Sequence, residues 1–393
     1  MDSSSEHYDV IVVGSRVAGA STAMLLAQWG HRVLLLDRAR PGSDTLSTHA
    51  LMRAGVLQLH RWGLLHRLVS AGTPPIRRAD IHYGDDAVGI AIKPVGGVDA
   101  LYAPRRTVLD SLLADAAREA GVELRFGVRV TNLIRNRAGR VVGVRASDTG
   151  GRSFHARATL TIGADGVRSS VARDARAHIY RRGNSAGSML YGYWSDVDVD
   201  GYEWFYRPGL TGGLVPTNDG RVCVWVGAPS ERFRNDLYAQ GRPAIQPIMS
   251  TLNRQAGRRV AAGRRVGPVR GFPGIRGFVR QAWGPGWALV GDAGHFKDPL
   301  SSHGITDALR DAELLARGVS LALHGLPEHE VLSDYQAIRD RLSIRLFEVT
   351  DAIASYRWDL ADISSLQLEL SAAMRDEVDA LLELDKLEGP AAA

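Results

Sequence analysis

The N-terminal 37 residues contain the feature that most limits the possible folds of this chain: strand, glycine-rich loop, helix and strand in immediate succession. Residues 8–13 are almost continuously apolar and end at Gly14, which predicts a strand covered on both faces. Residues 18–27 are rich in helix formers and precede Gly30, and residues 31–37 predict a second buried strand. This βαβ unit predicts an α/β fold with a doubly wound, largely parallel sheet.

The loop between the first strand and the helix has the six positions of a phosphate-binding turn. Gly14 would make the tight turn and Gly19 would let helix and sheet approach closely, although Arg16 replaces the usual middle glycine. Asp37, 18 residues beyond Gly19, would accept hydrogen bonds from a ribose and repel a 2′-phosphate. A dinucleotide site is therefore predicted, with a purely structural turn as the alternative. The predicted contacts come from Gly14, Arg16, Val17, Ala18, Gly19 and Asp37.

Composition excludes several other classes of protein. The single cysteine, Cys223, excludes an internal disulfide and a multi-cysteine metal centre, and no metal site is predicted. Residues 1–9 are polar and no apolar run approaches the length of a membrane span, so we expect a soluble, cytoplasmic protein. Residues 237–291 contain no acid and many arginines. We expect a solvated basic face there, or a surface for an anionic substrate or carrier, and no nucleic-acid partner.

Two later segments each combine a buried strand with glycine and aspartate. Residues 163–173 read Gly-Ala-Asp-Gly-Val-Arg-Ser-Ser-Val-Ala-Arg, and residues 288–299 read Ala-Leu-Val-Gly-Asp-Ala-Gly-His-Phe-Lys-Asp-Pro. A glycine-headed helix is predicted from Gly304. With the N-terminal loop, these segments resemble the motifs of FAD-dependent monooxygenases of the p-hydroxybenzoate hydroxylase type, over residues 7–320. The resemblance implies FAD as cofactor and NAD(P)H as electron donor, directly or through a flavin reductase.

The resemblance also implies which residues would surround the flavin ring. Asp292, after Gly291, would hold a ribityl hydroxyl, and Pro299 would lie by the ring edge with its fixed φ. The helix that begins with Gly304 and Ile305 would point its N–H groups at the N1–C2=O edge of the ring. A helix dipole there would stabilise the negative charge of reduced flavin.

A second group of residues would surround the nucleotide half of FAD. Arg106 matches the family's Arg-x-x-Leu at the head of a helix, with the preceding arginine as the alternative, and Arg53 would approach the pyrophosphate. Val130 would meet the adenine through its backbone, while Arg38 would stack on the adenine or remain solvent-exposed. Asp165 would tie cofactor loops together.

The implied reaction is monooxygenation through C4a-hydroperoxyflavin, with one atom of O2 inserted into a small organic substrate, aromatic or polycyclic. Aromatic residues alternate with polar ones over 191–225, which predicts an antiparallel sheet that roofs the substrate pocket, with ordinary core packing as the alternative. Lys297 would pair with a flavin or substrate anion, or merely with Asp298. His295 and His49 are further candidates for acid–base catalysis.

Three other functions are compatible with these motifs. A reductase of the geranylgeranyl reductase type would consume NAD(P)H without O2. A flavin halogenase would carry a Trp-x-Trp-x-Ile-Pro string, which this sequence lacks. A non-catalytic flavin-binding protein would hold FAD without rapid reoxidation. No second glycine fingerprint follows a strand, so no dedicated NAD(P)H domain is expected.

The predicted architecture is a doubly wound, Rossmann-like FAD-binding domain with an inserted antiparallel-sheet substrate domain and a helical C-terminal tail. The tail would pack beside the flavin domain or form the face of a homodimer. The FAD-binding domain is predicted from residues 7–75, 101–175 and 281–325, the substrate domain from 76–100 and 176–280, and the helical region from 326–393.

Overall fold

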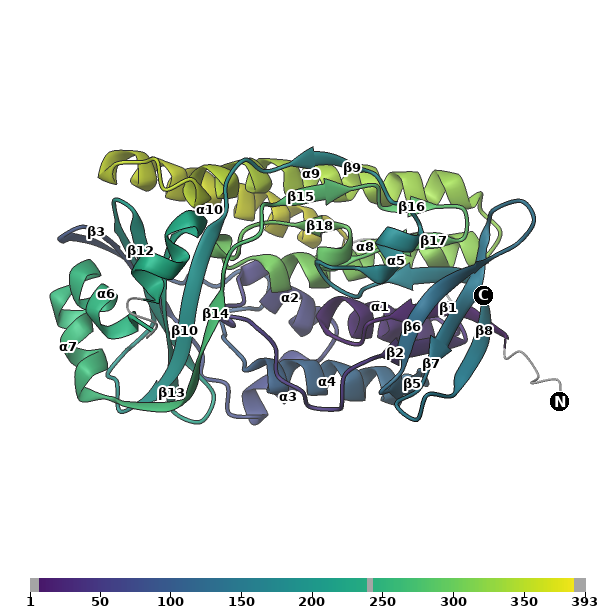
Figure 1. Cartoon of the computed structure of the whole chain (residues 1–393), viewed down its shortest axis with the longest axis horizontal. Helices are drawn as coiled ribbons and strands as arrows, with labels where there is room; N and C mark the ends of the chain where they lie inside the picture. Colours follow the sequence, from purple (N-terminus) through teal and green to yellow (C-terminus); the bar gives the residue numbers. More distant parts are fainter. Residues whose placement is uncertain (1–6, 239–242, 385–393) are drawn as a thin grey trace.

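The computed structural model describes residues 7–238 and 243–384. An eight-stranded sheet at one end of the elongated molecule is built around five parallel strands (Figure 1). Its main path has the order β16-β17-β8-β1-β2-β5, and β7, which pairs with β8 and β6, extends it. The strands are β1 (His7–Val13), β2 (Val33–Asp37), β5 (Glu123–Phe126), β6 (Arg129–Arg135), β7 (Val141–Ser147), β8 (Ser153–Gly163), β16 (Trp283–Gly284) and β17 (Trp287–Leu289).

The continuous apolar runs of β1 and β2 are explained by cover on both faces of this sheet. Val10 and Val12 share a core with the helices on one face, whereas Ile11 and Val13 share another core with β6 and β7 on the opposite face. The expected α/β class and the βαβ unit are confirmed. The first of these cores includes residues of α1 (Val17–Gln28), α2 (Arg53–Arg61), α3 (Leu65–Ser70), α4 (Arg106–Glu119) and α8 (Gly304–Leu323), and the second includes residues of α5 (Ser170–Asp174).

A seven-stranded sheet forms the other end of the molecule, in the order β14-β10-β13-β12-β11-β3-β4 (Figure 1). The predicted antiparallel pairing holds for β10 to β14, but β11 pairs with β3 in parallel. The predicted domain limits stay a prediction. The strands are β3 (Arg78–Tyr83), β4 (Asp86–Ala91), β10 (Gly187–Ser195), β11 (Tyr202–Arg207), β12 (Leu210–Thr217), β13 (Arg221–Pro229) and β14 (Arg264–Phe272).

The aromatic residues of this second sheet divide between its two faces. Tyr191, Tyr193 and Trp225 belong to a core shared with the C-terminal helices, while Trp194 and Phe205 face the opposite side, where α6 (Ile245–Leu252) and α7 (Arg254–Ala262) cover them. The rings are buried. The side chains expected to roof a pocket are thus packed, and only part of the aromatic set shares one face.

Two long helices, α9 (Glu328–Ala354) and α10 (Leu360–Leu384), run along one side of the molecule from one sheet toward the other (Figure 1). They confirm the predicted helical tail as far as residue 384, and its last nine residues lie outside the described part. Every helix that the structure describes is too short or too polar to cross a membrane. The remaining elements are β9 (Ile179–Arg182), β15 (Phe278–Arg280), β18 (His295–Phe296) and the short helical turns Ser230–Arg232, Phe233–Leu237, Gly291–Ala293 and Pro299–Ser301.

Candidate functional site

The three predicted cofactor loops meet at one edge of the parallel sheet. Val13 at the end of β1 pairs with Gly163 at the end of β8, and Gly163 also pairs with Leu289 at the end of β17. The loops that follow these strands therefore leave the sheet side by side. Carboxyl ends of parallel strands are where open α/β sheets bind their ligands.

Glycines, which have no side chain, allow these loops to approach one another. Gly14 has a φ of +103°, and a methyl group there would lie 2.4 Å from the carbonyl oxygen of Ala164. A methyl group on Gly19 would lie 1.8 Å from the carbonyl oxygen of Gly14, and one on Gly291 would lie 2.9 Å from Cβ of Ala18. Positive φ and backbone contact both require glycine, so the glycine roles inferred from the sequence have a structural basis.

Asp37 ends β2 at the same edge and is buried. Its Oδ2 accepts hydrogen bonds from the backbone N–H of Ser15 at 2.6 Å and from the Ser15 hydroxyl at 2.9 Å, while Oδ1 accepts from the N–H of Ala39 at 2.7 Å. A carboxylate has about four acceptor positions, so one remains for a ribose hydroxyl.

The neighbouring positions are arranged around Asp37. The N–H of Val128 donates to the Asp37 carbonyl oxygen at 2.8 Å, which brings the start of β6, with the buried Val130, next to it. Arg38 is solvent-exposed, as in the second of the two interpretations of its role. Arg53 donates instead to the carbonyl oxygen of Val98, at 3.3 Å, so its predicted approach to a pyrophosphate stays a prediction.

Two arginines stand close to the glycine loop. Arg16 precedes α1 and lies 3.5 Å from the carbonyl oxygen of Asp44, while Arg106 forms a two-pronged ion pair with Asp110 at 2.9–3.0 Å. Burial and, secondly, the positive charge of Arg106 lower the pKa of Arg16. The two guanidiniums therefore repel each other in the half-buried loop, and a pyrophosphate between them would relieve that repulsion.

Asp292 follows Gly291 in a helical turn and is half-buried. Burial and the charge of Asp307 raise the pKa of Asp292 to about 6, against the opposing effect of Arg106 and Lys297. The sequence predicted that Asp292 and Arg106 belong to one site although 186 positions separate them, and their electrostatic interaction shows that the fold brings them together.

Helix α8 is largely buried but begins at an open position. Gly304 is exposed, a methyl group there would meet no atom within 4 Å, and His303 before it gives the first turn no side-chain cap. The N-terminal turn therefore offers its N–H groups and positive dipole end to open space. Ile305 is half-buried beside it, and Pro299 begins the short helix just before. These features fit a flat ring with an anionic edge.

Lys297 does not form one of the two ion pairs expected for it. Its buried ammonium forms an ion pair with Asp307 of α8. The alternative pairing with Asp298 is wrong, because Asp298 accepts hydrogen bonds from the N–H groups of Gly187 at 2.6 Å and Leu300 at 3.0 Å. Burial would raise the pKa of Asp307, but the nearby cations outweigh it and hold that pKa below its ordinary value.

The two histidine candidates are both buried and neutral. Burial, together with the charge of Lys297, lowers the pKa of His295 well below its ordinary value, and neither ring nitrogen has a hydrogen-bond partner among the described residues. His49 lies against the second sheet, where its Nε2 contacts the hydroxyl of Tyr193. Acid–base roles for either side chain stay predictions.

A buried ionic network behind the start of α8 was missed by the sequence analysis. Glu377 of α10 contacts Nε2 of His303 and accepts from Arg310 at 2.8 Å, and Arg310 also contacts Asp311 at 2.6 Å. The ligand-type atoms of His303, Asp307 and Glu377 lie within 4.8 Å of one another. Because Arg310 and Lys297 already pair with these carboxylates, the group does not suit a metal cation.

A signal for Glu377 was nevertheless present in the sequence. Ile363, Leu370, Ala373 and Leu381 mark one helical face of α10, all four are buried, and Glu377 falls on the same face. An acid on an apolar face requires a buried partner, so this position was a candidate. Nothing in the local sequence identified Arg310 or His303 as that partner.

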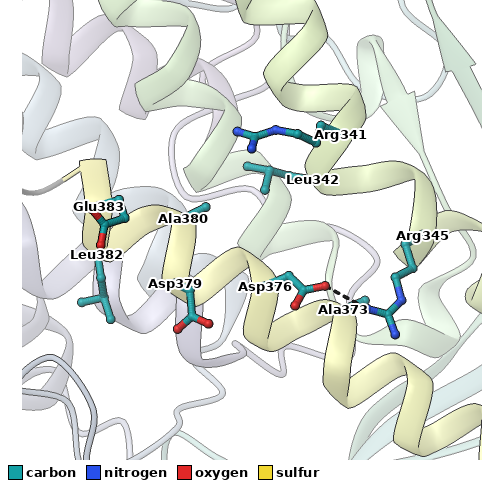
Figure 2. Close-up of a pocket in the computed structure, with 9 residues that line it drawn as sticks. All are labelled: Arg341, Leu342, Arg345, Ala373, Asp376, Asp379, Ala380, Leu382 and Glu383. Atoms are coloured by element: carbon teal, nitrogen blue, oxygen red, sulfur yellow. Dashed lines mark hydrogen bonds and ion pairs between the residues drawn. The ribbon is translucent and has the colours of Figure 1, made fainter.

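A cavity of about 520 Å³ lies between α9 and α10, away from this edge of the sheet. Figure 2 shows its charged lining, in which Arg345 of α9 pairs with Asp376 of α10 at 2.9 Å. Arg341 and Leu342 extend from α9, and Asp379 from α10. None of the residues predicted to bind FAD lines this cavity, so it is separate from the candidate site.

Comparisons with known proteins agree with this geometry. A family model described as FAD binding domain matches residues 7–350. Digeranylgeranylglycerophospholipid reductase of Methanocella arvoryzae is 25% identical over 348 residues, which are 85% of this chain and 83% of the reductase. Menaquinone reductase of Mycolicibacterium smegmatis is 28% identical over 328 residues, 78% of this chain and 75% of that enzyme.

A solved structure has a similar fold. PqsL of Pseudomonas aeruginosa, in complex with 2-aminobenzoylacetate, matches with a TM-score of 0.80 and 22% identity, covering 92% of this chain and 99% of PqsL. The family match covers most of the chain, and the loops that it includes form the glycine-lined edge described above. The chain therefore belongs to the FAD-binding-domain family and is an FAD-dependent oxidoreductase.

Proposed function

We propose that this protein is an FAD-dependent monooxygenase that inserts one oxygen atom of O2 into a small aromatic or polycyclic organic substrate. NAD(P)H supplies the electrons, directly or through a flavin reductase. One observation carries the proposal: residues 298–300, which include the proline expected beside the flavin ring, also contact the second sheet. Asp298 accepts from Gly187 at the start of β10, and Leu300 packs in the same core as Tyr191 and Tyr193.

Residues 298–300 would therefore bring the core that contains Tyr191 and Tyr193 close to the position expected for the flavin ring. Pro299 lies in the middle of these three residues, and the open Gly304 end of α8 follows it. A substrate bound where the two sheets meet would thus lie next to the ring, which is what oxygen transfer over a short distance requires. The similarity to PqsL, described as a probable FAD-dependent monooxygenase, supports this assignment.

When bound, FAD supplies the chemistry of oxygen activation and transfer. The glycine loop would hold its pyrophosphate, Arg106 would reach the cofactor beside that loop, and Asp37 and Asp292 would accept hydrogen bonds from its ribose and ribityl hydroxyls. The first turn of α8 would stabilise negative charge at the ring edge, and the buried Lys297–Asp307 ion pair would hold the start of that helix in place. The packed aromatic face excludes water from the substrate side.

A reductase function is the second candidate, because both curated relatives carry reductase names. Such an enzyme would saturate a double bond or reduce a quinone with the same cofactor and would not need O2. The two reductases share 25% and 28% identity with this chain and PqsL shares 22%, but PqsL matches the fold over 92% of this chain and 99% of its own. We therefore place oxygen transfer first.

The deciding experiment compares aerobic and anaerobic turnover of the FAD-loaded protein. Under ¹⁸O2 with NADPH or NADH and a flavin reductase, 2-aminobenzoylacetate is the first substrate probe, and mass spectrometry should detect one labelled oxygen in the product. A menaquinone is the probe for the second candidate. If the protein reduces the quinone without O2, and no labelled oxygen enters a product of 2-aminobenzoylacetate, the reductase function takes first place.

A further inference from the structure

Two arginines from distant parts of the sequence meet at a single carboxylate beside the aromatic face. Arg270 of β14 contacts Oδ2 of Asp44 at 2.9 Å, and Arg105, just before α4, approaches the same oxygen at 3.6 Å. The side chains of Asp44 and Arg105 are only 15% and 14% exposed. Asp44 lies on the segment that leaves the flavin-binding sheet after β2 and crosses to the second sheet.

His49 lies farther along the same segment in a constrained position. It is 1% exposed and has a φ of +70°, a backbone conformation that costs energy for a residue other than glycine. Its ring stacks on Tyr193 with a centroid distance of 5.6 Å, its Nε2 contacts the Tyr193 hydroxyl, and Arg105 covers the same tyrosine ring at 4.0 Å.

One polar atom of this cluster lacks a partner. Nδ1 of His49 is buried and has no hydrogen bond to any described residue. Burial and the charges of Arg106, Arg105 and Arg270 lower the pKa of His49 well below its ordinary value, so the ring is neutral. If the Tyr193 hydroxyl donates to Nε2, the proton of the neutral ring is on Nδ1, which is then a buried donor without an acceptor.

The charges of the cluster leave an excess of one positive charge. Arg106 is balanced by Asp110, and Arg16 faces the loop where the pyrophosphate is proposed to bind. Arg105 and Arg270 then share the single carboxylate of Asp44. A buried donor and an uncompensated guanidinium are both complementary to an anion.

We propose that Arg105, Arg270 and His49 form the recognition site for an anionic group of the substrate, a carboxylate or an ionised hydroxyl on an aromatic ring. The two guanidiniums and the Nδ1–H would hold this anionic group. This inference rests on the proposed function, because it names the substrate class of the same site.

A phosphate of a nicotinamide dinucleotide is the other source of an anion for these arginines. The cluster favours a small organic acid, since Asp44 and Arg105 are mostly covered and His49 is fully buried. A large dinucleotide would reach Arg270, which is 34% exposed, more easily than His49. Competition by NADP⁺ tests this alternative directly.

The test measures binding and does not depend on turnover. Isothermal calorimetry on the FAD-loaded protein compares 2-aminobenzoate with its neutral isostere 2-aminobenzamide. We expect the acid to bind at least about tenfold more tightly than the amide, because hydrogen bonds to a charged group are the stronger ones. Arg270→Gln should remove this preference, and Asp44→Asn should increase it, because the competing carboxylate is lost.

Arg254→Gln is the matched control, since Arg254 is an exposed arginine of α7, which covers the opposite face of the second sheet from Tyr191 and Tyr193. It removes the same charge and should leave the preference unchanged. Equal affinities for acid and amide in the wild type, no binding of the acid at millimolar concentration, or displacement by NADP⁺ alone would each overturn the inference. Failure of the proposed function is distinguishable, because it would leave acid binding intact without ¹⁸O in any product.

Discussion

At the scale of single residues, the candidate site depends on glycines that have two different kinds of surroundings. Gly19 is enclosed, since a methyl group there would lie 1.8 Å from the Gly14 carbonyl oxygen, whereas a methyl group on Gly304 would meet nothing within 4 Å. The first glycine is required by the folded protein itself. The second leaves space that we assign to the flavin ring.

Substitutions at these two glycines should therefore separate folding from cofactor binding. Gly19→Ala should destabilise the protein by about 3 kcal/mol, since the loop or α1 must shift to admit the methyl group. Gly304→Leu should leave the stability of the cofactor-free protein unchanged, because it adds an exposed side chain at a helix start, yet abolish FAD binding. Urea denaturation measures the first effect and fluorescence titration with FAD the second.

The result that would contradict this assignment is specific. If Gly304→Leu binds FAD as tightly as the wild type, the ring does not lie against the first turn of α8. Gly42→Ala is a useful control for positive φ alone, because Gly42 has a φ of +69° in open space and lies outside the site. Gly42→Ala should lower the free energy of unfolding less than Gly19→Ala does.

Asp298 gives a pH dependence whose sign can be worked out. Burial raises the pKa of its carboxyl from the ordinary 3.8 to about 7, although N–H donors from Leu300 and Gly187 oppose this. The folded state then binds a proton that the unfolded state releases, so stability is greatest at the acidic end and falls as the pH rises from about 4 to 7. At 1.36 kcal/mol per pKa unit the loss is at most about 4 kcal/mol.

The measurement is urea denaturation of the cofactor-free protein between pH 4.5 and 7.5. Asp298→Asn removes the titrating group, so its stability should vary less over this range than that of the wild type, whatever its absolute value. Parallel pH curves for the two proteins would show that Asp298 does not titrate there.

At the scale of secondary-structure elements, α10 is held to the flavin-binding end by a buried charge. Glu377→Gln should destabilise the protein by about 3 kcal/mol, since Arg310 is fully buried and loses one of its carboxylate partners. Asp376→Asn is the matched control, because Asp376 is adjacent but pairs with Arg345 on the surface (Figure 2). Its cost should stay below about 1 kcal/mol. Equal effects in denaturation experiments would refute the anchoring role of Glu377.

The elements differ in how far the sequence determines them. The βαβ unit was predictable because buried parallel strands leave a continuous apolar pattern. The parallel pairing of β11 with β3 was not, because it joins segments more than a hundred residues apart. The division of Trp194 and Tyr191 between opposite faces also depends on which helices cover the sheet.

The candidate site was predictable where a motif fixes a backbone shape and not where side chains meet across the fold. Gly14, Gly19 and Asp37 could be named because their neighbours in sequence create the turn. For Lys297 the sequence offered a flavin or substrate anion, or the adjacent Asp298, whereas Asp307 reaches it from the next helix. Asp44, Arg105 and Arg270 come from three segments that are distant in the sequence, so no local sequence pattern could predict that their side chains are in contact.

At the scale of the whole molecule, the segments that would hold FAD come from distant parts of the chain. The loops after β1, β8 and β17 meet at one edge of the sheet, and α8 begins beside them. A ligand that contacts all of these segments stabilises only the state in which they are assembled, because the unfolded chain cannot present them together.

FAD should therefore raise the thermal stability of the whole chain and not of one part. At a free concentration 100 times the dissociation constant, the expected gain is about 2.7 kcal/mol. Differential scanning calorimetry should show one transition that moves upward with FAD, while Gly304→Leu should unfold at the same temperature with and without the cofactor. A transition that splits in two with FAD, with only one part shifted, would mean that the second sheet and the C-terminal helices unfold independently of the flavin site.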